Sequence, residues 1–365
     1  MKHILHSLRS RLSRTPKSII KPYQPSSHSK REYDIYKPRP QSYWYDDGSK
    51  WMHSNDTPPP IITSPNINTT TFRLISWNID MLIGFAEPRM RAALTYLSTI
   101  VSSTPAEIPV IVFFQEMIQT DLKQIRDAEW IQEKFFITEL DGKNWSSDYY
   151  GTTTLVDRRL RVQSVFRVPW VSKFQRDGLF VDVALSASSS EVSSEKANSK
   201  ALRLCNTHLE SLVADPPVRP LQLGAASPYL HDPKVASGVL AGDLNAIQPF
   251  DRTLHSDNIL KDAYLALGGQ EDSDEGFTWG YQVPQAVREK FGCSRMDKIL
   301  FTGALDVKHF ERIGMGVKVE EEVVVREMSE KGDGEWVTDH YGVMGDFVLD
   351  ERWEFEVGGD GGESV

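Results

Sequence analysis

Two patterns of apolar and polar positions alternate along the chain between residues 71 and 350. Short runs rich in β-branched and aromatic residues predict strands, because such side chains suit a buried, pleated surface. Apolar positions spaced three and four residues apart predict helices instead. The predicted strands cover residues 72–77, 110–114, 179–185, 202–207, 239–241, 299–301 and 342–348, and the predicted helices cover residues 87–101 and 261–267.

The alternation of strands and helices predicts an α/β architecture in one large domain, residues 71–350. A segment of this length is close to the size at which a single hydrophobic core stops growing, which favours packed sheets in one domain over two domains. The longest apolar run, Val110 to Phe114, is far shorter than the roughly 18 residues that a membrane-spanning helix needs. The pattern therefore excludes an integral membrane protein, and we expect no membrane partner.

The ends of the chain lie outside these patterns. Residues 1–70 are predicted to be a disordered tail and linker, basic at first and then rich in Pro and Ser, so the fold is expected to start near residue 71. Residues 1–31 contain eight Lys and Arg and no acidic residue, which is typical of a mitochondrial transit peptide, a basic tail, or an arm for nuclear import or nucleic acid. Residues 186–200 predict a surface hairpin insertion, and residues 351–365 predict an acidic, glycine-rich tail.

Charge and cysteine content narrow the classes of function. The chain has a formal net charge of -10, but residues 1–70 hold 11 Lys and Arg against 5 Asp and Glu, so the rest is strongly acidic. An acidic body argues against non-specific coating of nucleic acid, which depends on neutralising many phosphates, and leaves room for a small cationic site. The two cysteines, Cys205 and Cys293, form neither a disulfide framework nor a Cys-x-x-Cys zinc motif. They indicate a reducing intracellular compartment.

Residues that suit metal and phosphate chemistry recur where the predicted strands end. Taken singly, each is a weak signal, because a Glu after a strand is commonly exposed and Gly-Asp-x-Asn is commonly a turn. Together they are a stronger signal of a functional site, because the carboxyl ends of several strands can bring their side chains into one cleft. The six groups are residues 76–80, 115–116, 206–211, 242–245, 295–299 and 338–342.

The order and separation of these groups resemble the endonuclease/exonuclease/phosphatase superfamily over residues 72–349. This resemblance implies a four-layer α/β sandwich, with two packed β-sheets flanked by helices. Within the superfamily, the motifs are most similar to those of the tyrosyl-DNA phosphodiesterase 2 family: Trp77-Asn78-Ile79-Asp80, Gln115-Glu116, His208-Leu209-Glu210-Ser211, Gly242-Asp243-Leu244-Asn245, Thr278-Trp279 and Asp339-His340.

Two positions depart from the pattern of that family. Met81 stands where a glycine is usual, and Ala246-Ile247 stand where an arginine is usual. Both positions touch the expected DNA groove, so they bear on affinity and substrate choice and not on the hydrolytic centre.

Phosphodiester cleavage needs a cation on the phosphoryl oxygen, an activated water and donors for the developing charge. In the metal position of the family, Glu116 is expected to bind Mg²⁺, or Mn²⁺ in its place, with Asn78 helping through a water. Asp243 is the expected general base for the attacking water, and Asn245 would orient that water or the phosphate.

The donors for the developing charge are expected to be two histidines, His208 and His340. The resemblance pairs Asp297 with His340, a carboxylate that would fix the tautomer of the imidazole and favour its protonated form. Asp339 would perform part of that work or lie near the metal.

The remaining candidate residues concern the substrate. Trp279 is expected either to stack on a nucleobase or to belong to the core. Tyr149 is expected either to face the phosphate or to pack on a strand. The full set of expected substrate-binding residues is Tyr149, Arg176, Ser211, Arg219, Gln222 and Trp279.

The resemblance implies a Mg²⁺-dependent phosphodiesterase that hydrolyses 5′-phosphotyrosyl bonds at DNA ends and so removes covalent protein adducts in DNA repair. We expect a monomer that acts on DNA ends carrying a 5′ tyrosyl-linked protein or peptide, in the nucleus or, alternatively, the mitochondrion. Rival activities are an abasic-site endonuclease or 3′-exonuclease, a poly(A) deadenylase, and a lipid or inositol phosphatase. A catalytically silent binding module is the non-enzymatic alternative, against which the intact set of candidate catalytic residues argues.

Overall fold

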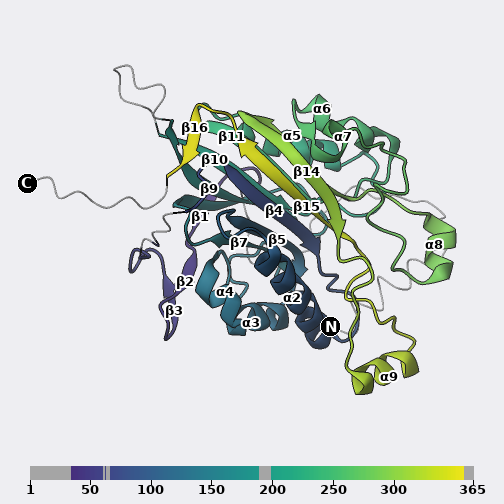
Figure 1. The fold of residues 1–365 in the computed structure, drawn as a ribbon. Coiled ribbons are helices and arrows are strands. Elements are labelled where there is room, and N and C mark those ends of the chain that lie inside the picture. The colour runs from purple at the N-terminus through teal and green to yellow at the C-terminus, as the bar shows by residue number, and fades with distance from the viewer. Residues whose placement is uncertain (1–33, 61, 63–65, 189–198, 357–365) are drawn as a thin grey trace, which may run out of the picture. The chain divides into compact units, whose positions relative to one another are not determined.

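Two mixed β-sheets of eight strands each form the centre of the protein (Figure 1). The computed structural model describes residues 34–60, 62, 66–188 and 199–356. Sheet A has the order β1 (Arg39–Gln41), β8 (Val162–Pro169), β9 (Asp177–Ala187), β10 (Lys200–Thr207), β11 (Val235–Asp243), β13 (Asp297–Gly303) and β12 (Lys261–Asp262), with β16 (Trp353–Phe355) beside β9. Sheet B has the order β14 (Leu305–Ile313), β15 (Gly342–Leu349), β4 (Thr71–Asn78), β5 (Val110–Met117), β7 (Gly151–Asp157), β6 (Phe135–Ile137), β2 (Trp44–Asp46) and β3 (Trp51–His53).

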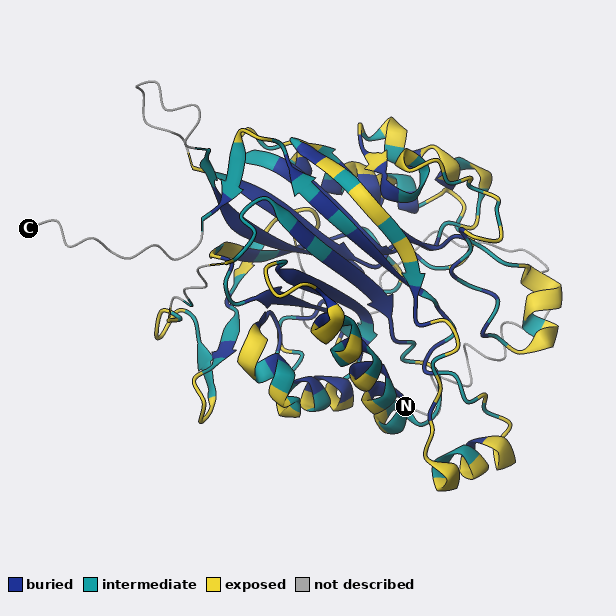
Figure 2. Ribbon diagram, in the orientation of Figure 1, coloured by how far each residue is buried: buried dark blue, intermediate teal, exposed yellow. Residues whose placement is uncertain are grey.

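Helices cover the outer faces of the two sheets, and the strands are the most deeply buried elements (Figure 2). One apolar cluster, which includes Phe72 and Leu204, lies between the sheets. A second cluster joins Leu97, on the helix Ala86–Ser103, to sheet B, and a third joins Leu223, on the helix Arg219–Leu230, to sheet A. These layers confirm the predicted four-layer α/β sandwich. The helices are α2 (Ala86–Ser103), α3 (Gln119–Asp127), α4 (Glu129–Lys134), α5 (Arg219–Leu230), α6 (Leu254–Asp257), α7 (Ala263–Ala266), α8 (Gln285–Phe291) and α9 (Glu322–Glu330), with a 3-10 turn, η2, at Pro249–Arg252.

Each predicted strand lies within a strand of the structure, and α2 confirms the longer predicted helix. The single helix predicted over residues 261–267 is wrong at its start. Lys261 and Asp262 pair with β13 as β12, and only four residues form α7. The side chain of Asp262 accepts hydrogen bonds from the amides of Tyr264 and Leu265, so the helix begins after this capping residue. Among the described residues, no helix is long and apolar enough to span a bilayer.

The predicted linker and the predicted C-terminal tail are wrong where the structure describes them. β1, β2 and β3 lie inside residues 32–70 and extend both sheets, and β16 lies inside residues 351–365. Tyr45 and Phe355 are buried there, which explains why these short segments order against the core. The predicted basic segment 1–31, most of the insertion at 186–200 and the last nine residues of the tail lie outside the described residues.

Candidate active site

Strand ends from both sheets place the candidate residues together. β4 runs parallel to β5, and β10 runs parallel to β11, so the carboxyl ends within each pair lie at one edge of a sheet. Asn78 ends β4, Glu116 lies one residue before the end of β5, His208 follows β10 and Asp243 ends β11. The side-chain amide of Asn78 donates to Oδ2 of Asp243 over 3.0 Å, and this bond joins the two sheets at the site.

Three residues at these strand ends adopt the left-handed backbone conformation that non-glycine residues rarely use. The φ angle is 54° at Asp80, 58° at Glu116 and 49° at Asn245. Such a conformation costs about 1–3 kcal/mol at each residue and is concentrated at functional sites. The amide of Asn245 donates to Oδ1 of Asp243 over 2.8 Å, which helps to hold one of these turns.

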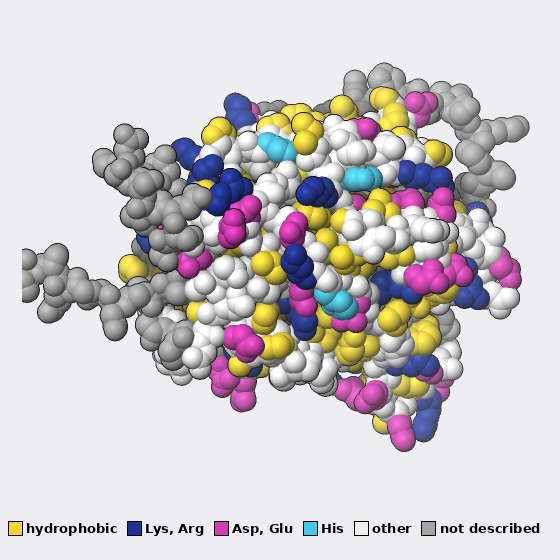
Figure 3. Space-filling view, turned by 45° about the horizontal axis from the view of Figure 1, so that its top comes forward, with side chains coloured by type: hydrophobic (Ala, Val, Ile, Leu, Met, Phe, Trp, Pro, Cys, Tyr) yellow, Lys and Arg dark blue, Asp and Glu magenta, His cyan; other side chains and the backbone are white. Residues whose placement is uncertain are grey.

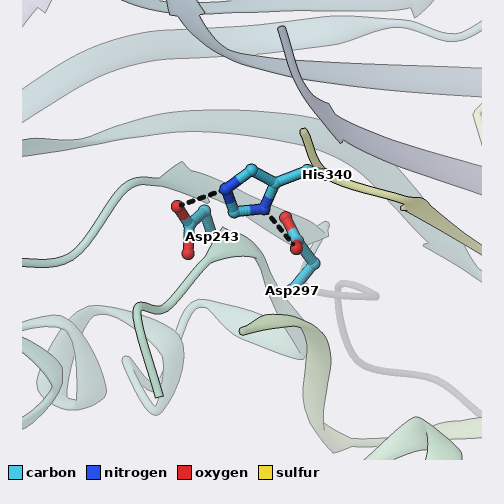
Figure 4. Close-up of side chains that lie close together, drawn as sticks. All are labelled: Asp243, Asp297 and His340. Atoms are coloured by element: carbon cyan, nitrogen blue, oxygen red, sulfur yellow. Dashed lines mark hydrogen bonds and ion pairs between the residues drawn. The ribbon is translucent and has the colours of Figure 1, made fainter. Parts of the chain in front are cut away.

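The imidazole of His340 lies between two buried aspartates (Figure 4). Its Nδ1 is 2.8 Å from Oδ2 of Asp297, and its Nε2 is 3.7 Å from Oδ2 of Asp243. Burial alone would lower the pKa of His340, but the charges of Asp297, Asp243 and Asp339 raise it well above its usual range. His340 is therefore held as an imidazolium, with Asp297 fixing its orientation.

Asp243 is the most connected carboxylate of the site. Burial would raise its pKa, but the charge of His340 lowers it, together with the hydrogen bonds from His208 and from the amide of Asn245. The low pKa keeps Asp243 ionised at neutral pH, ready to accept a hydrogen bond or a proton from water. It also makes the carboxylate a weak base, so the water needs activation from a second source.

His208 differs from His340 in its hydrogen bonding. Arg176 places a guanidinium nitrogen against Nδ1 of His208 and donates from another nitrogen to Oγ of Ser211 over 2.9 Å. A guanidinium has only donors, so Nδ1 accepts and the ring proton is on Nε2. Nε2 lies 3.2 Å from Oδ2 of Asp243 and 3.7 Å from Oε1 of Glu116. The contacts of His208 thus fix the orientation of its ring, with Nε2 toward Asp243 and Glu116.

Three carboxylates of the site, Asp80, Glu116 and Asp339, act on one another through their charges. Burial raises the pKa of Asp80 well above its usual range, and the charges of Asp339 and Glu116 raise it further. Burial also raises the pKa of Asp339, although the charge of His340 opposes that rise. Oxygen donors that repel one another in this way match the ligand preference of a hard divalent cation, whose charge would relieve the repulsion.

This carboxylate group fits a divalent cation better than the other acidic cluster of the site. Asp243, Asp297 and His340 also bring ligand atoms within 4.8 Å of one another. In that cluster, however, the imidazolium of His340 is already bonded to Asp297, and a protonated ring has no free lone pair for a metal. Asn78 accepts the amide of Asp80 on Oδ1 over 2.9 Å, which leaves one lone pair for an ion or its water.

The family comparison agrees with this arrangement. The Endonuclease/Exonuclease/phosphatase family model matches residues 75–340, which include every candidate catalytic residue. The chain belongs to this family. No curated protein sequence matches the chain.

Solved structures show the same family fold. The crystal structure of D. rerio TDP2 complexed with single strand DNA product is 20% identical, with a TM-score of 0.55, over 76% of this chain and 98% of that one. Truncated Caenorhabditis elegans TDP2 is 22% identical, with a TM-score of 0.54, over 76% and 98% of the two chains. An endonuclease/exonuclease/phosphatase family protein from Bacteroides thetaiotaomicron is 13% identical, with a TM-score of 0.50, over 78% and 99%.

The two aromatic candidates, Trp279 and Tyr149, differ in their burial and in their contacts with the site. Trp279 is half-buried, and its indole N–H donates to Oδ2 of Asp339 over 2.7 Å, so the ring is held beside the carboxylates. Tyr149 is 57% exposed and lies outside the residues that line the hollow next to Glu116. Its neighbour Tyr150 lines that hollow together with Arg176 and His208. Burial raises the pKa of Tyr150 to about 12, so it is a neutral phenol.

The prediction that Arg219 faces substrate is wrong. Arg219 is buried at the start of α5, and its Nε and one terminal nitrogen donate to the carboxylate of Asp251 over 2.8 and 2.7 Å. The remaining donors bind the backbone oxygens of Glu210 and Leu212 and the side chain of Gln248. With every guanidinium nitrogen occupied, Arg219 holds two loops together beneath the site and has no donor left for a phosphate.

The prediction that Gln222 faces substrate is wrong for the same reason. Its Oε1 accepts from the amide of Glu210 over 2.7 Å, and its Nε2 donates to the carbonyl of Val171 over 2.9 Å. Glu210 in turn accepts from the hydroxyl of Ser172 over 2.6 Å. Gln222 therefore fixes the loop that follows His208.

Two residues of the motifs have a role that sequence reasoning missed. Gln115 donates to Oδ1 of Asn206 over 2.9 Å, and Asn206 donates to the carbonyl of Thr153 over 3.0 Å. These buried amides cross from one sheet to the other directly behind Glu116 and His208. Their place in the motifs was a signal, because a buried amide with several partners fixes the relative position of the elements it joins.

The surface charges of the protein are mixed on one face. Basic and acidic side chains are interspersed on the face drawn in Figure 3. A mixed surface of this kind contributes little non-specific attraction for a polyanion. For a phosphate, the site itself offers the buried donors Arg176, His208 and His340.

Proposed function

We propose that this protein is a divalent-metal-dependent phosphodiesterase that hydrolyses 5′-phosphotyrosyl bonds at DNA ends. The observation that carries the proposal is the convergence of four groups on one point. The carboxylate of Asp243 lies 3.2 Å from Nε2 of His208 and 3.7 Å from Nε2 of His340, and Glu116 lies 3.7 Å from His208. A base, two donors and a metal carboxylate are the parts that in-line attack of water on phosphorus requires.

The residues divide the reaction as follows. Asp243 orients the attacking water and takes its proton, while Asn245 next to it holds the water or the phosphate. His208 donates from Nε2, and the imidazolium of His340 meets the charge that develops on the non-bridging oxygens. A divalent cation held by Glu116, with Asp80 and Asp339 beside it, would polarise a phosphoryl oxygen and make the water more acidic.

Mg²⁺ is the cation that we propose for this site, with Mn²⁺ as a substitute. Glu116 is one hard oxygen ligand, and Mg²⁺ commonly keeps several waters and few protein ligands. The waters that remain on such an ion would be oriented by Asn78 and Asp80.

The nature of the leaving group supports a tyrosyl substrate. Phenol has a pKa of about 10, so a tyrosyl phenolate leaves with little proton donation, whereas a sugar alkoxide is far more basic. Asp243 is ionised and has no proton to give, and Nδ1 of His208 accepts from Arg176. His340 is therefore the acidic group that the geometry provides. TDP2, the tyrosyl-DNA phosphodiesterase 2 of the motif resemblance, has been crystallised with a single strand DNA product, which supports a DNA strand as the other half of the substrate.

The test compares matched oligonucleotides that carry a 5′-phosphotyrosine, an internal abasic site or a plain 3′ end, each as DNA and as RNA. We expect fastest release of tyrosine from DNA with Mg²⁺ present, and no turnover with EDTA. Glu116→Gln should be inactive, and Glu311→Gln, which removes an exposed carboxylate on β14, is the matched control. Equal or faster cleavage at the abasic site would favour the endonuclease reading instead.

The cellular side of the proposal is the removal of covalent protein adducts from DNA by a monomer in the nucleus. The basic composition of residues 1–31 fits nuclear import and also fits mitochondrial import. Imaging of the full chain fused to a fluorescent protein decides between the two compartments, and sedimentation of the purified protein measures its oligomeric state.

A further inference from the structure

A segment that precedes the matched family region joins the edges of both sheets. β1 pairs with β8 in sheet A, and β2 meets β6 in sheet B through the pair Trp44 and Ile137. Between them, the rings of Tyr43 and Phe136 pack edge to face, with their centroids 5.0 Å apart. We call residues 39–46 the edge strap. The family model begins only at residue 75, so the strap lies outside the region that defines the family.

Two polar side chains of the edge strap reach a buried carboxylate through its partners. Arg39 donates to Oγ of Ser146 over 3.0 Å, and Ser146 donates to Oδ2 of Asp177 over 2.7 Å. Gln41 accepts from Nε of Arg167 over 2.8 Å, and Arg167 lies 3.1 Å from Oδ1 of Asp177. The strap thus contacts Ser146 and Arg167, the two side chains that bond the carboxylate oxygens of Asp177.

Asp177 is placed directly behind His208. The residue before Asp177 is Arg176, which contacts Nδ1 of His208. The carbonyl of Asp177 accepts from the hydroxyl of Thr207 over 2.9 Å. Ser146, Asp177 and Arg176 line the same hollow as Glu116 and His208. A shift of Asp177 would therefore move Arg176 on one side and the end of β10 on the other.

We propose that Arg39 and Gln41 are positioning residues for hydrolysis, acting through Asp177 on the orientation of His208. The inference rests on the proposed function only in requiring that phosphodiester cleavage takes place at His208. Neither strap residue touches a reacting atom. Their effect is geometric, because a displacement of about 1 Å at a reacting group can cost on the order of 10²-fold in rate.

The experiment uses the full chain and the 5′-phosphotyrosyl oligonucleotide. In Arg39→Met, which removes the donor to Ser146, we expect kcat to fall about tenfold while KM and the thermal unfolding midpoint stay near their wild-type values. Arg39→Lys keeps a donor and should recover part of the rate. Lys50→Met is the matched control, because it removes a positive charge from the exposed turn between β2 and β3, just after the edge strap.

A double-mutant cycle tests the route. If Arg39 acts through Ser146, then Ser146→Ala and the double variant Arg39→Met/Ser146→Ala should lose about the same rate as Arg39→Met alone. Additive losses would overturn this route, and wild-type kcat in Arg39→Met would overturn the positioning role. A loss of rate that merely follows a lowered unfolding midpoint would also overturn the positioning role.

The outcome stays separable from that of the proposed function. If the wild type cleaves the abasic or plain oligonucleotide but not the phosphotyrosyl one, the proposed substrate is wrong. The same variants are then measured on the substrate that is cleaved. A selective loss of kcat there still supports the edge strap, and unchanged kcat still refutes it.

Discussion

Replacement of Asp297 by asparagine tests the charge on His340. Asp297→Asn keeps the size of the side chain and an oxygen that can accept from Nδ1 of His340 across 2.8 Å, but it removes the negative charge. Burial lowers the pKa of His340, and Asp297 is the first of the three carboxylates that together raise it. The substitution therefore shifts the pKa of His340 downward, toward the value that burial favours.

The size of the effect follows from what the imidazolium does in the reaction. One preorganised donor to the developing charge contributes about 10²–10³ in kcat. In the variant His340 is still a neutral donor. Oδ2 of Asp243 still lies 3.7 Å from Nε2 of His340, and its negative charge favours the protonated ring. We therefore expect the lower end, a loss of about 10²-fold in kcat near neutral pH, with KM little changed because the donor acts mainly in the transition state.

The pH dependence gives the sign of the effect. Because the folded-state pKa of His340 lies above its unfolded value, its ion pairs contribute stability that is fully present below the unfolded pKa, about 6.5, and lost as pH rises through the folded pKa. The wild-type kcat should fall over the same alkaline range. In Asp297→Asn both changes should move to lower pH.

The assay records kcat on the phosphotyrosyl oligonucleotide and the thermal unfolding midpoint from about pH 6 to about pH 10, a range that brackets the ordinary pKa of histidine. His340→Gln is the control, since it has no group to titrate there and should lack the alkaline fall. If Asp297→Asn and the wild type share the same alkaline limb, or the same kcat, His340 is not the charged donor and the reasoning is refuted.

Four further predictions concern other parts of the chain. Glu116→Gln should lower kcat by at least about 10³-fold without changing the unfolding midpoint, since the cation supplies several kcal/mol of charge stabilisation; retained turnover would refute the metal assignment. Trp279→Ala should weaken binding of a product oligonucleotide by about 1–3 kcal/mol in fluorescence anisotropy, because the ring would stack on a base, and unchanged affinity would refute the stacking role. Arg219→Met should lower the free energy of unfolding in urea by about 3–5 kcal/mol, because it strands Asp251 as a buried unpaired charge, whereas a rise in KM alone would restore its substrate role. Deletion of residues 1–31 should change localisation in cells and leave kcat unaltered, and a large loss of kcat on a short substrate would contradict this.

Local patterns were enough to predict the strands of the central sheets and not enough to predict their edges. The run at Val110 to Phe114 is apolar at every position because β5 is buried on both faces, and that property is visible in the sequence. The edge strap shows no such pattern, since β1 and β2 have three residues each. Their pairing depends on contacts such as Arg39 with Arg167, which are far apart in the chain.

The candidate site shows the same division between residue type and residue environment. The motifs place Asp243, His208 and Glu116 at or next to strand ends, and the structure brings these three side chains together through His208, whose Nε2 lies 3.2 Å from Asp243 and 3.7 Å from Glu116. The resemblance predicts that Arg219 faces substrate, because it matches a position of the family that does so. Its actual partner is Asp251, which the sequence could not reveal because the ion pair depends on the packing of α5 against a later loop.

The two departures from the family pattern have different consequences. Asp80, the residue before Met81, takes the left-handed conformation, so position 81 has no need of a glycine. Met81 contributes its backbone amide, which donates to Oε2 of Glu116 over 3.1 Å, and a methionine does this as well as a glycine. Ile247 is 39% exposed, and its amide is bonded to Oδ2 of Asp251 over 3.0 Å, so this position stabilises the loop but presents an apolar side chain where a cation is usual. The first departure leaves the carboxylate of Glu116 supported, and only the second changes the side chain that the chain presents where the family pattern has an arginine.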